Sequence, residues 1–277
     1  MKSASNDTQQ KDEKNKKKRF DRKEQMSLSN VKIAGSLINQ GFLFSSDKFY
    51  AVNEKAKIID TNTATRIKEI ARANGVTENV FFQNIWEVAL MNFLKTKDVV
   101  VGSVVSGRDT SVRGIENIAG LLMTVLPVRL TEKEIQFREQ LKNSQSDNSR
   151  LQRYINVDSR DLFEKEYEDY QSAFIFENYP ISDNKAFFEN NDSEYSILSV
   201  EEREELQFDL NLYVIPRNDI FELQLSYNLN MYDDKQVDEL FTIVDCLIKK
   251  VIEDSNITII GLSEYVNEKL YASEGAI

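Results

Sequence analysis

The sequence predicts an α/β fold, more specifically an α+β sandwich in which helices cover mainly one face of a mixed β-sheet. Residues 98–105 form a β-branched run, D-V-V-V-G-S-V-V, that is typical of a central strand covered on both faces. Every second residue is apolar in 208–214 and again in 221–227, with a Pro-Arg-Asn-Asp turn between them, which predicts an antiparallel hairpin. Helical periodicity in the other segments provides the layer that covers the sheet.

The folded part is expected to begin with a short strand end at 57–59, followed by two helices. The first helix ends at Gly75, which suits a C-terminal cap because it lacks a side chain. Thr77 is predicted to cap a second, longer helix, and the wide apolar arc of that helix indicates burial on more than one side. The first helix carries its apolar residues on one face, at Ala64, Ile67, Ile70 and Ala71.

The middle of the chain is predicted to hold one helix and one strand. The pattern Thr131-x-x-Glu134 matches a capping box, which predicts a helix from there through Leu141. The polar stretch 143–149 is expected to interrupt or fray that helix. Residues 173–176 form a strand that stops at Pro180, and the acidic, irregular segment 181–206 is expected to be a long excursion loop.

The last major helix is amphipathic. Asp233 and Asp234 are expected at its N-terminus, where negative charge interacts favourably with the helix dipole. Cys246 falls nearly opposite the apolar stripe, so its thiol is expected to be structurally passive. The stripe consists of Val237, Leu240, Phe241, Val244, Leu247, Ile248 and Val251.

Charge divides the 277-residue chain into a basic start and an acidic remainder. Residues 1–28 carry nine Lys and Arg but only five Asp and Glu, whereas the whole chain has a formal net charge of −11. This lysine-rich start lacks apolar periodicity and is predicted to be a disordered basic tail. It is either a docking tail for an acidic partner or a solvated tail or linker remnant. An ambiguous lead-in at 29–54 follows, and the folded domain is expected at 55–270.

The composition argues against several classes of function. The negative net charge disfavours general nucleic-acid binding, and no apolar run is long enough for a membrane helix. One cysteine, Cys246, excludes an internal disulfide and fits a cytoplasmic location. With no histidine and one cysteine, a structural zinc site is disfavoured. A carboxylate site for Mg²⁺ or Ca²⁺ stays formally open, but no EF-hand or similar loop is present, so no metal site is assigned.

Five segments, in order, resemble the C-terminal half of a condensation domain from nonribosomal peptide synthetases, which belong to the chloramphenicol-acetyltransferase-like superfamily. The segments are G-V-T-E-N-V-F-F-Q-N-I-W (75–86), D-V-V-V-G-S-V-V-S-G-R (98–108), G-I-E-N-I-A-G-L-L-M-T-V-L-P-V-R (114–129), F-I-F-E-N-Y-P (174–180), and F-D-L-N-L with L-S-Y-N (208–228).

The resemblance implies one lobe of a two-lobed enzyme. In that family two lobes form a V around a tunnel, where a thioester on the phosphopantetheine arm of a carrier protein meets an acceptor amine. The HHxxxDG motif lies in the N-terminal lobe, and this chain has no histidine. The implied partners are therefore an N-terminal lobe on another chain and peptidyl carrier proteins. The chain itself is expected to hold no cofactor and no catalytic residue, and to be inactive alone.

The resemblance also assigns two site segments. Ser106, Gly107 and Arg108 would form the floor loop of the tunnel, and Glu177-Asn178-Tyr179-Pro180 would lie at the latch between the lobes. Gly107 allows a sharp turn, and Arg108 offers a fork of donors to a carboxylate across an interface. The alternatives are an ordinary turn glycine, a surface ion pair of little energetic value, and a proline that only ends a strand.

Three other functions stay open at this stage. The chain is a non-catalytic module that docks carrier proteins or a synthetase subunit, in which case an exposed apolar patch is expected. It is the truncated remnant of a longer gene. It is a self-assembled acyltransferase like the trimeric chloramphenicol enzymes, which also need a histidine that this chain lacks.

Overall fold

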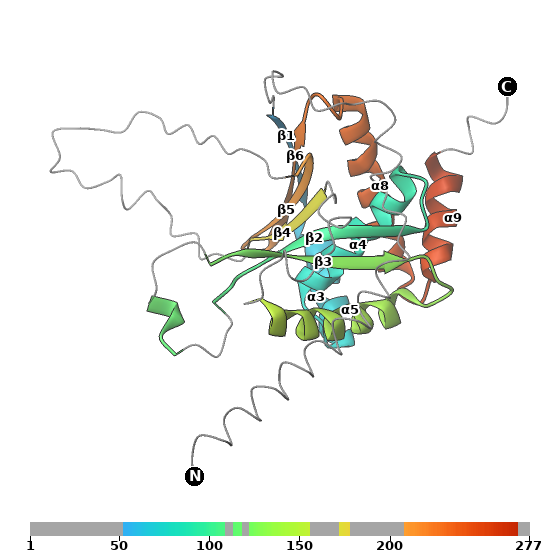
Figure 1. Ribbon diagram of the computed structural model, residues 1–277. Coiled ribbons are helices and arrows are strands. Elements are labelled where there is room, and N and C mark those ends of the chain that lie inside the picture. The colour runs from blue at the N-terminus through green and yellow to red at the C-terminus, as the bar shows by residue number, and fades with distance from the viewer. Residues whose placement is uncertain (1–51, 109–112, 118–121, 156–171, 178–207, 271–277) are drawn as a thin grey trace, which may run out of the picture.

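A computed structural model describes residues 52–108, 113–117, 122–155, 172–177 and 208–270. These residues form one mixed six-stranded sheet and a layer of helices beside it (Figure 1). The predicted α/β class is therefore confirmed. The predicted basic tail 1–28, nearly all of the lead-in 29–54 and the predicted excursion loop 181–206 lie outside the described residues.

The sheet has the strand order β1-β6-β5-β4-β2-β3. Strand β4 runs parallel to both of its neighbours, β5 and β2, whereas the other neighbouring pairs are antiparallel. The strands are β1 (Val52–Ile59), β2 (Asp98–Val105), β3 (Thr124–Thr131), β4 (Ser172–Phe176), β5 (Leu210–Arg217) and β6 (Ile220–Asn228).

The main helices of the described chain are grouped around α4, which packs on the sheet and contacts each of the others. Asp60 caps α3 by accepting a hydrogen bond from the Thr63 N–H at 3.0 Å. The sequence prediction is confirmed at both ends of the following turn: Gly75 ends α3 with a φ of 67°, and Thr77 caps α4. The helices are α3 (Thr61–Asn74), α4 (Glu78–Phe93), α5 (Phe137–Leu151), α8 (Asp234–Glu253) and α9 (Ile259–Leu270), with short 3-10 turns η1 (Ile115–Asn117) and η2 (Gln152–Tyr154).

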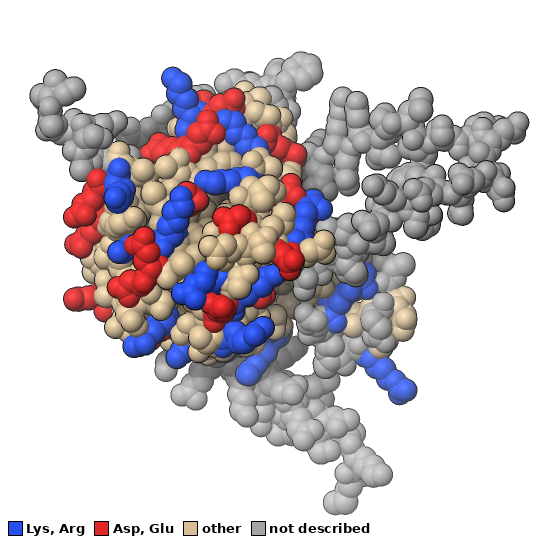
Figure 2. Space-filling view, turned by 180° about the vertical axis from the view of Figure 1, so that it is seen from behind, with Lys and Arg blue, Asp and Glu red and all other residues tan. Residues whose placement is uncertain are grey.

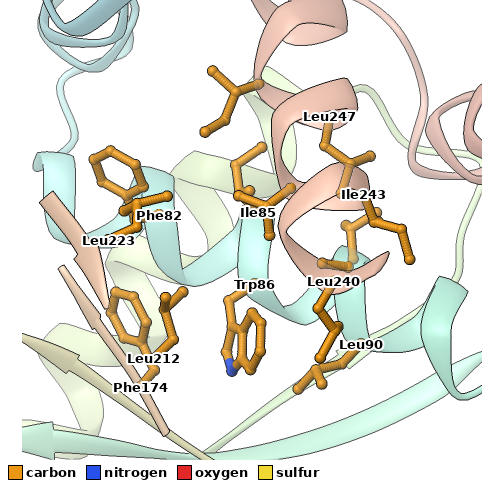
Figure 3. Packing of buried hydrophobic residues seen from close by; sticks show 14 of the residues in the cluster. Phe82, Ile85, Trp86, Leu90, Phe174, Leu212, Leu223, Leu240, Ile243 and Leu247 are labelled. Atoms are coloured by element: carbon orange, nitrogen blue, oxygen red, sulfur yellow. The ribbon is translucent and has the colours of Figure 1, made fainter. Parts of the chain in front are cut away.

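The core lies between the sheet and the helices, with Trp86 of α4 near its centre (Figure 3). The indole is fully buried, and its N–H donates to Ser172 Oγ at the start of β4 at 3.1 Å. Phe82 packs edge-on against Phe221 of β6, with 4.8 Å between ring centroids. Nearly every residue of α4 from Val80 onward is buried, as its wide apolar arc predicts.

Two predictions about α5 are wrong, and both errors have a tertiary cause. Thr131 does not cap a helix, because it is the last residue of β3 and pairs with Asp98. The helix begins instead at Phe137, whose N–H donates to the Ile257 carbonyl at 2.8 Å. The polar stretch 143–149 also remains helical throughout, since Ser144 and its neighbours form hydrogen bonds with α4.

Strand β3 and helix α9 were not predicted from the sequence. The hydrophobic run before Arg129 forms strand β3, which lies at one edge of the sheet. This strand includes Pro127, and proline is tolerated in an edge strand. Helix α9 docks Leu262 and Val266 in the core. Strand β1 is also longer than the predicted strand end, beginning at Val52.

The hairpin, the strand at 98–105 and the last amphipathic helix are confirmed. The hairpin turn is shorter than predicted, because Pro216 and Arg217 stay in β5 and only Asn218 and Asp219 form the turn. Asn218 has a φ of 48°, a conformation that asparagine tolerates better than most residues. The predicted stripe of α8 is buried, and Cys246 is a half-buried free thiol outside it.

Candidate functional site

The parallel strands place the start of each predicted site segment, Ser106 and Glu177, at one edge of the sheet. Ser106 follows β2 and Glu177 follows β4, and these strands run parallel with Ser103 opposite Phe174. Ser106 and Glu177 each lie three residues beyond this pair, toward the carboxyl ends of the two strands. The Glu177 N–H in turn donates to the Val214 carbonyl of β5 at 2.9 Å. The carboxyl edge of parallel strands is where open α/β sheets bind ligands.

Gly107 is required by a close backbone contact at this edge. It is buried, and a Cβ atom built on it would lie 1.9 Å from the carbonyl oxygen of Leu122. No side chain fits in that space unless the backbone of residue 122 moves. Gly107 therefore allows the loop after β2 to pack against the segment that enters β3. The sequence position of Gly107 indicates only a turn.

Arg108 bonds to the backbone of its own chain. Its Nη1 donates to the carbonyl oxygen of Ile115 at 3.1 Å, and its backbone N–H donates to Ser106 Oγ at 3.3 Å. Gly114, at a φ of 83°, starts the η1 turn and accepts a hydrogen bond from the Asn117 N–H. Arg108 is exposed, which leaves it accessible to another protein. Contact of its guanidinium with a carboxylate of another lobe stays a prediction.

The loop after β2 thus contacts the segment before β3 at two points. One is the contact of Gly107 with Leu122, and the other is the hydrogen bond from Arg108 to Ile115. The sequence marks Gly107 and Arg108 but carries no signal for Leu122 or Ile115. A glycine indicates that a close approach is possible, but the approaching atoms are set by the fold.

A different interaction stabilises the opposite end of β2. Arg129 of β3 forms a two-point ion pair with Asp98, at 2.9 Å from Nε to Oδ1 and 2.6 Å from Nη2 to Oδ2. Both side chains are about one-fifth exposed, so water screens this pair only in part. The pair joins the starting end of β2 to the edge strand, away from the candidate site. Arg129 is therefore a structural residue.

The predicted latch segment is described only at its first residue. Glu177 directly follows the half-buried Phe176 at the end of β4, whereas Asn178, Tyr179 and Pro180 lie outside the described residues. The role of this segment at a lobe interface therefore stays a prediction.

The described part of the chain holds no group of three or more His, Cys, Asp or Glu side chains that could bind a metal ion. Nor do its helices include one that is both long and apolar enough to cross a bilayer. The face shown in Figure 2 carries Lys and Arg interspersed with Asp and Glu, without one large field of a single sign. Such a face provides little long-range steering of a charged ligand.

Perturbed pKa values occur away from the loop that follows β2. Burial raises the pKa of Glu87, in the middle of α4, to about 8, and it raises the pKa of Tyr232 to about 12. Burial and the neighbouring Asp234 carboxylate raise the pKa of Tyr227 to about 12 as well. Both phenols therefore stay protonated at neutral pH and are unsuited to act as bases.

Comparisons with known proteins agree on one family. A family model described as "Condensation domain" matches residues 5–267. Bacitracin synthase 3 of Bacillus licheniformis is 30% identical over 218 residues, which are 77% of this chain and 3% of that protein. This chain therefore spans a small fraction of such curated relatives.

Two solved structures share the fold. The condensation domain from the monacolin K polyketide synthase MokA superimposes with a TM-score of 0.61 at 17% identity, covering 80% of this chain and 53% of that one. A holo four-domain nonribosomal peptide synthetase bound to AMP and glycine gives a TM-score of 0.64 at 12% identity, covering 76% of this chain and 17% of that one.

Proposed function

We propose that this chain, which belongs to the condensation-domain family, forms the C-terminal lobe of such a domain at residues 55–270. In this role it contributes one wall of the tunnel where a carrier-bound aminoacyl or peptidyl thioester meets an amine. The supporting observation is that Ser106, the first residue of the predicted floor loop, and Glu177, the first residue of the predicted latch, directly follow the parallel strands β2 and β4 at the same edge of the sheet.

The reaction itself needs groups that this chain lacks. The amine nitrogen attacks the thioester carbonyl, a C–N bond forms, the C–S bond breaks, and the phosphopantetheine thiol leaves. A positioned base assists by taking the amine proton, and hydrogen-bond donors stabilise the oxyanion of the tetrahedral intermediate. With no histidine in the chain, an imidazole base must come from elsewhere. We assign it to an N-terminal lobe that bears HHxxxDG on another chain.

In this proposal the chain contributes shape and positioning. Ser106, Gly107 and Arg108 form the tunnel floor; the Arg108 side chain bonds to the Ile115 carbonyl and Gly107 packs on the Leu122 backbone, which supports a fixed loop. Glu177, with the following Asn178-Tyr179-Pro180, lies at the latch between lobes. Peptidyl carrier proteins deliver both substrates on phosphopantetheine arms, and the chain acts in the cytoplasm.

Complementation tests this function directly. The chain is mixed with a purified N-terminal lobe that bears HHxxxDG, and the complex is sized by chromatography with light scattering. Amide formation is then measured from two loaded carrier proteins. We expect a 1:1 complex that transfers the acyl group, no transfer by either lobe alone, and no transfer when the second histidine of the partner motif is replaced by alanine. Failure of every such lobe to restore transfer would contradict the proposal.

A matched pair of glycine substitutions tests the floor loop. Gly107→Ala forces a Cβ to within 1.9 Å of the Leu122 backbone, whereas Gly261→Ala in α9 meets only side-chain atoms, the nearest at 3.1 Å. We expect Gly107→Ala to lower the rate of amide formation by the complementing pair at least about tenfold, because a shift of about 1 Å in a positioning loop costs much of the rate. Gly261→Ala should leave the rate unchanged. Equal rates of amide formation for both variants would contradict the assignment of Gly107 to the tunnel floor.

A non-catalytic docking module is the second candidate, and the absence of histidine favours it. In that case the chain binds a carrier protein or a synthetase subunit but never restores acyl transfer. The same mixtures distinguish the two functions, because binding without amide formation supports docking alone. A chain that binds none of these proteins would instead fit a gene remnant.

A further inference from the structure

Helix α4 carries a row of buried polar side chains where it packs against α5. We call Gln83, Asn84 and Glu87 of α4, together with Ser144 and Asn148 of α5, the α4–α5 polar cluster. Asn148 Nδ2 donates to Gln83 Oε1 at 2.7 Å, and Ser144 Oγ donates to Asn84 Oδ1 at 2.9 Å. All three α4 members are at most 2% exposed.

Glu87 is the one ionisable member of this cluster, and its hydrogen bonding is incomplete. Its Oε1 accepts a long hydrogen bond of 3.3 Å from Gln83 Nε2, and its Oε2 has no hydrogen-bond partner. The side chain is 1% exposed. A buried carboxylate without a cation or several donors is costly, and a carboxyl group in such a place lowers the cost by binding a proton.

The part of the chain that the structure describes places no compensating charge beside Glu87. The side chains that α5 places in or beside the cluster, Gln140, Ser144 and Asn148, are all uncharged. Among the described residues no charged group alters the pKa of Glu87, which burial raises and the Gln83 amide lowers. The net result is a value of about 8, compared with 4.5 for an unperturbed carboxyl.

We propose that Glu87 is a proton-operated lock on the packing of α5 against α4. The folded chain holds this carboxyl in its neutral form, and loss of the proton creates a buried charge with a single amide donor. The charge is relieved when water enters the cluster, and the opening is placed between α4 and α5 because Gln83, which donates to Glu87, also accepts from Asn148 of α5. This inference does not depend on the proposed catalytic role.

The direction of the pH effect follows from the raised pKa. Below pH 4.5 both folded and unfolded chains hold the proton, so this group adds no penalty. Between 4.5 and about 8 the unfolded chain releases the proton while the folded chain retains it. The folding equilibrium constant therefore falls by up to about tenfold for each pH unit in that window. Above it the penalty stays constant.

Urea unfolding of the full chain between pH 5 and 9 tests the lock. The variant Glu87→Gln keeps the size and the Gln83 contact but has no proton to lose, and Glu139→Gln replaces an exposed acid on α5 as the matched control. We expect the folding constant of the wild type and of Glu139→Gln to fall together as the pH rises. The excess of Glu87→Gln over both should grow by up to about tenfold per pH unit, up to about pH 8. Parallel curves for all three proteins would overturn the proposal.

Amide hydrogen exchange locates the opening. After correction for intrinsic exchange rates, α5 of the wild type should lose protection between pH 6 and 9, and α5 of Glu87→Gln should keep it. If Glu87→Gln fails to fold, Glu87→Met provides an apolar replacement of similar length for the same comparison. Protection of α5 that is independent of pH in the wild type would contradict a proton-operated lock.

Discussion

Helices α4 and α8 both pack in the core, but the acidic side chains in the middle of each helix lie in opposite environments. On α8, Asp238 and Asp245 point to the surface and pair with Lys55 and Lys57 of β1, at 2.8 and 3.4 Å. On α4, Glu87 is buried without a cation. The comparison shows that hydration determines the state of a carboxyl group. Because water solvates the α8 carboxylates, their ion pairs carry a small desolvation cost and stabilise only weakly, whereas the exclusion of water raises the pKa of Glu87 on α4.

Sequence periodicity predicts which acidic residues face water only for α8. Its apolar residues lie on one stripe, so the polar residues between them must face water. Helix α4 is surrounded by the sheet, α3, α5, α8 and α9, which leaves no face for water. Its polar residues are buried because of that position, and substitutions on and around the two helices measure the energetic difference.

The largest effect is expected at the centre of α4. Trp86→Ala removes a fully buried indole and leaves Ser172 Oγ without its donor. We expect a loss of about 3–5 kcal/mol in the free energy of unfolding, from the lost transfer energy and the cavity. Thermal and urea unfolding measure this change. A loss below about 1 kcal/mol would show that α4 is not the centre of the core.

A smaller effect is expected in the α4–α5 polar cluster. Ser144→Ala removes the donor to Asn84 Oδ1, which stays buried. An unsatisfied buried acceptor costs about 1–3 kcal/mol. Ser149→Ala is the control, since Ser149 lies on the same helix and bonds to the Gln145 carbonyl at an exposed position. Equal stability of the two variants would mean that water satisfies Asn84.

The cap of α8 should contribute less. Asp233 accepts from the Gln236 N–H at 2.9 Å, and the Gln236 side chain accepts from the Asp233 N–H at 2.9 Å, which completes a capping box. Asp233→Ala should cost about 1 kcal/mol, and Asp233→Ser should recover most of that loss. Urea midpoints of the three proteins provide the measurement. No recovery with serine would point to charge rather than to capping.

The smallest effect is expected at the surface of α8. Asp238→Asn breaks the ion pair with Lys55, in which the aspartate side chain is 65% exposed. We expect a change of at most about 1 kcal/mol, which salt at about 1 M should reduce further. A loss of several kcal/mol in the free energy of unfolding that does not depend on salt would show that this α8 ion pair is not weakened by water, contrary to the comparison with α4.

Elements with local signals could be predicted from the sequence. The hairpin follows from alternation with period 2, the α8 stripe from a period of 3.6, and the helix ends at Gly75, Thr77 and Asp233 from the chemistry of single residues. Each of these signals depends on residues a few positions apart. Ordered family segments also indicated the α/β class and marked Gly107 and Arg108.

Features that join distant segments depend on the tertiary structure. Helix α5 starts at Phe137 because the carbonyl of Ile257, far along the chain, accepts its N–H. Gly107 must be a glycine because of the Leu122 carbonyl, and Ser106 and Glu177 follow strand ends at the same edge because β2 and β4 run parallel. The pKa of Glu87 is raised because the other helices and the sheet exclude water from α4. Such contacts depend on how the elements pack, and a periodic pattern within one segment carries no information about its neighbours in space.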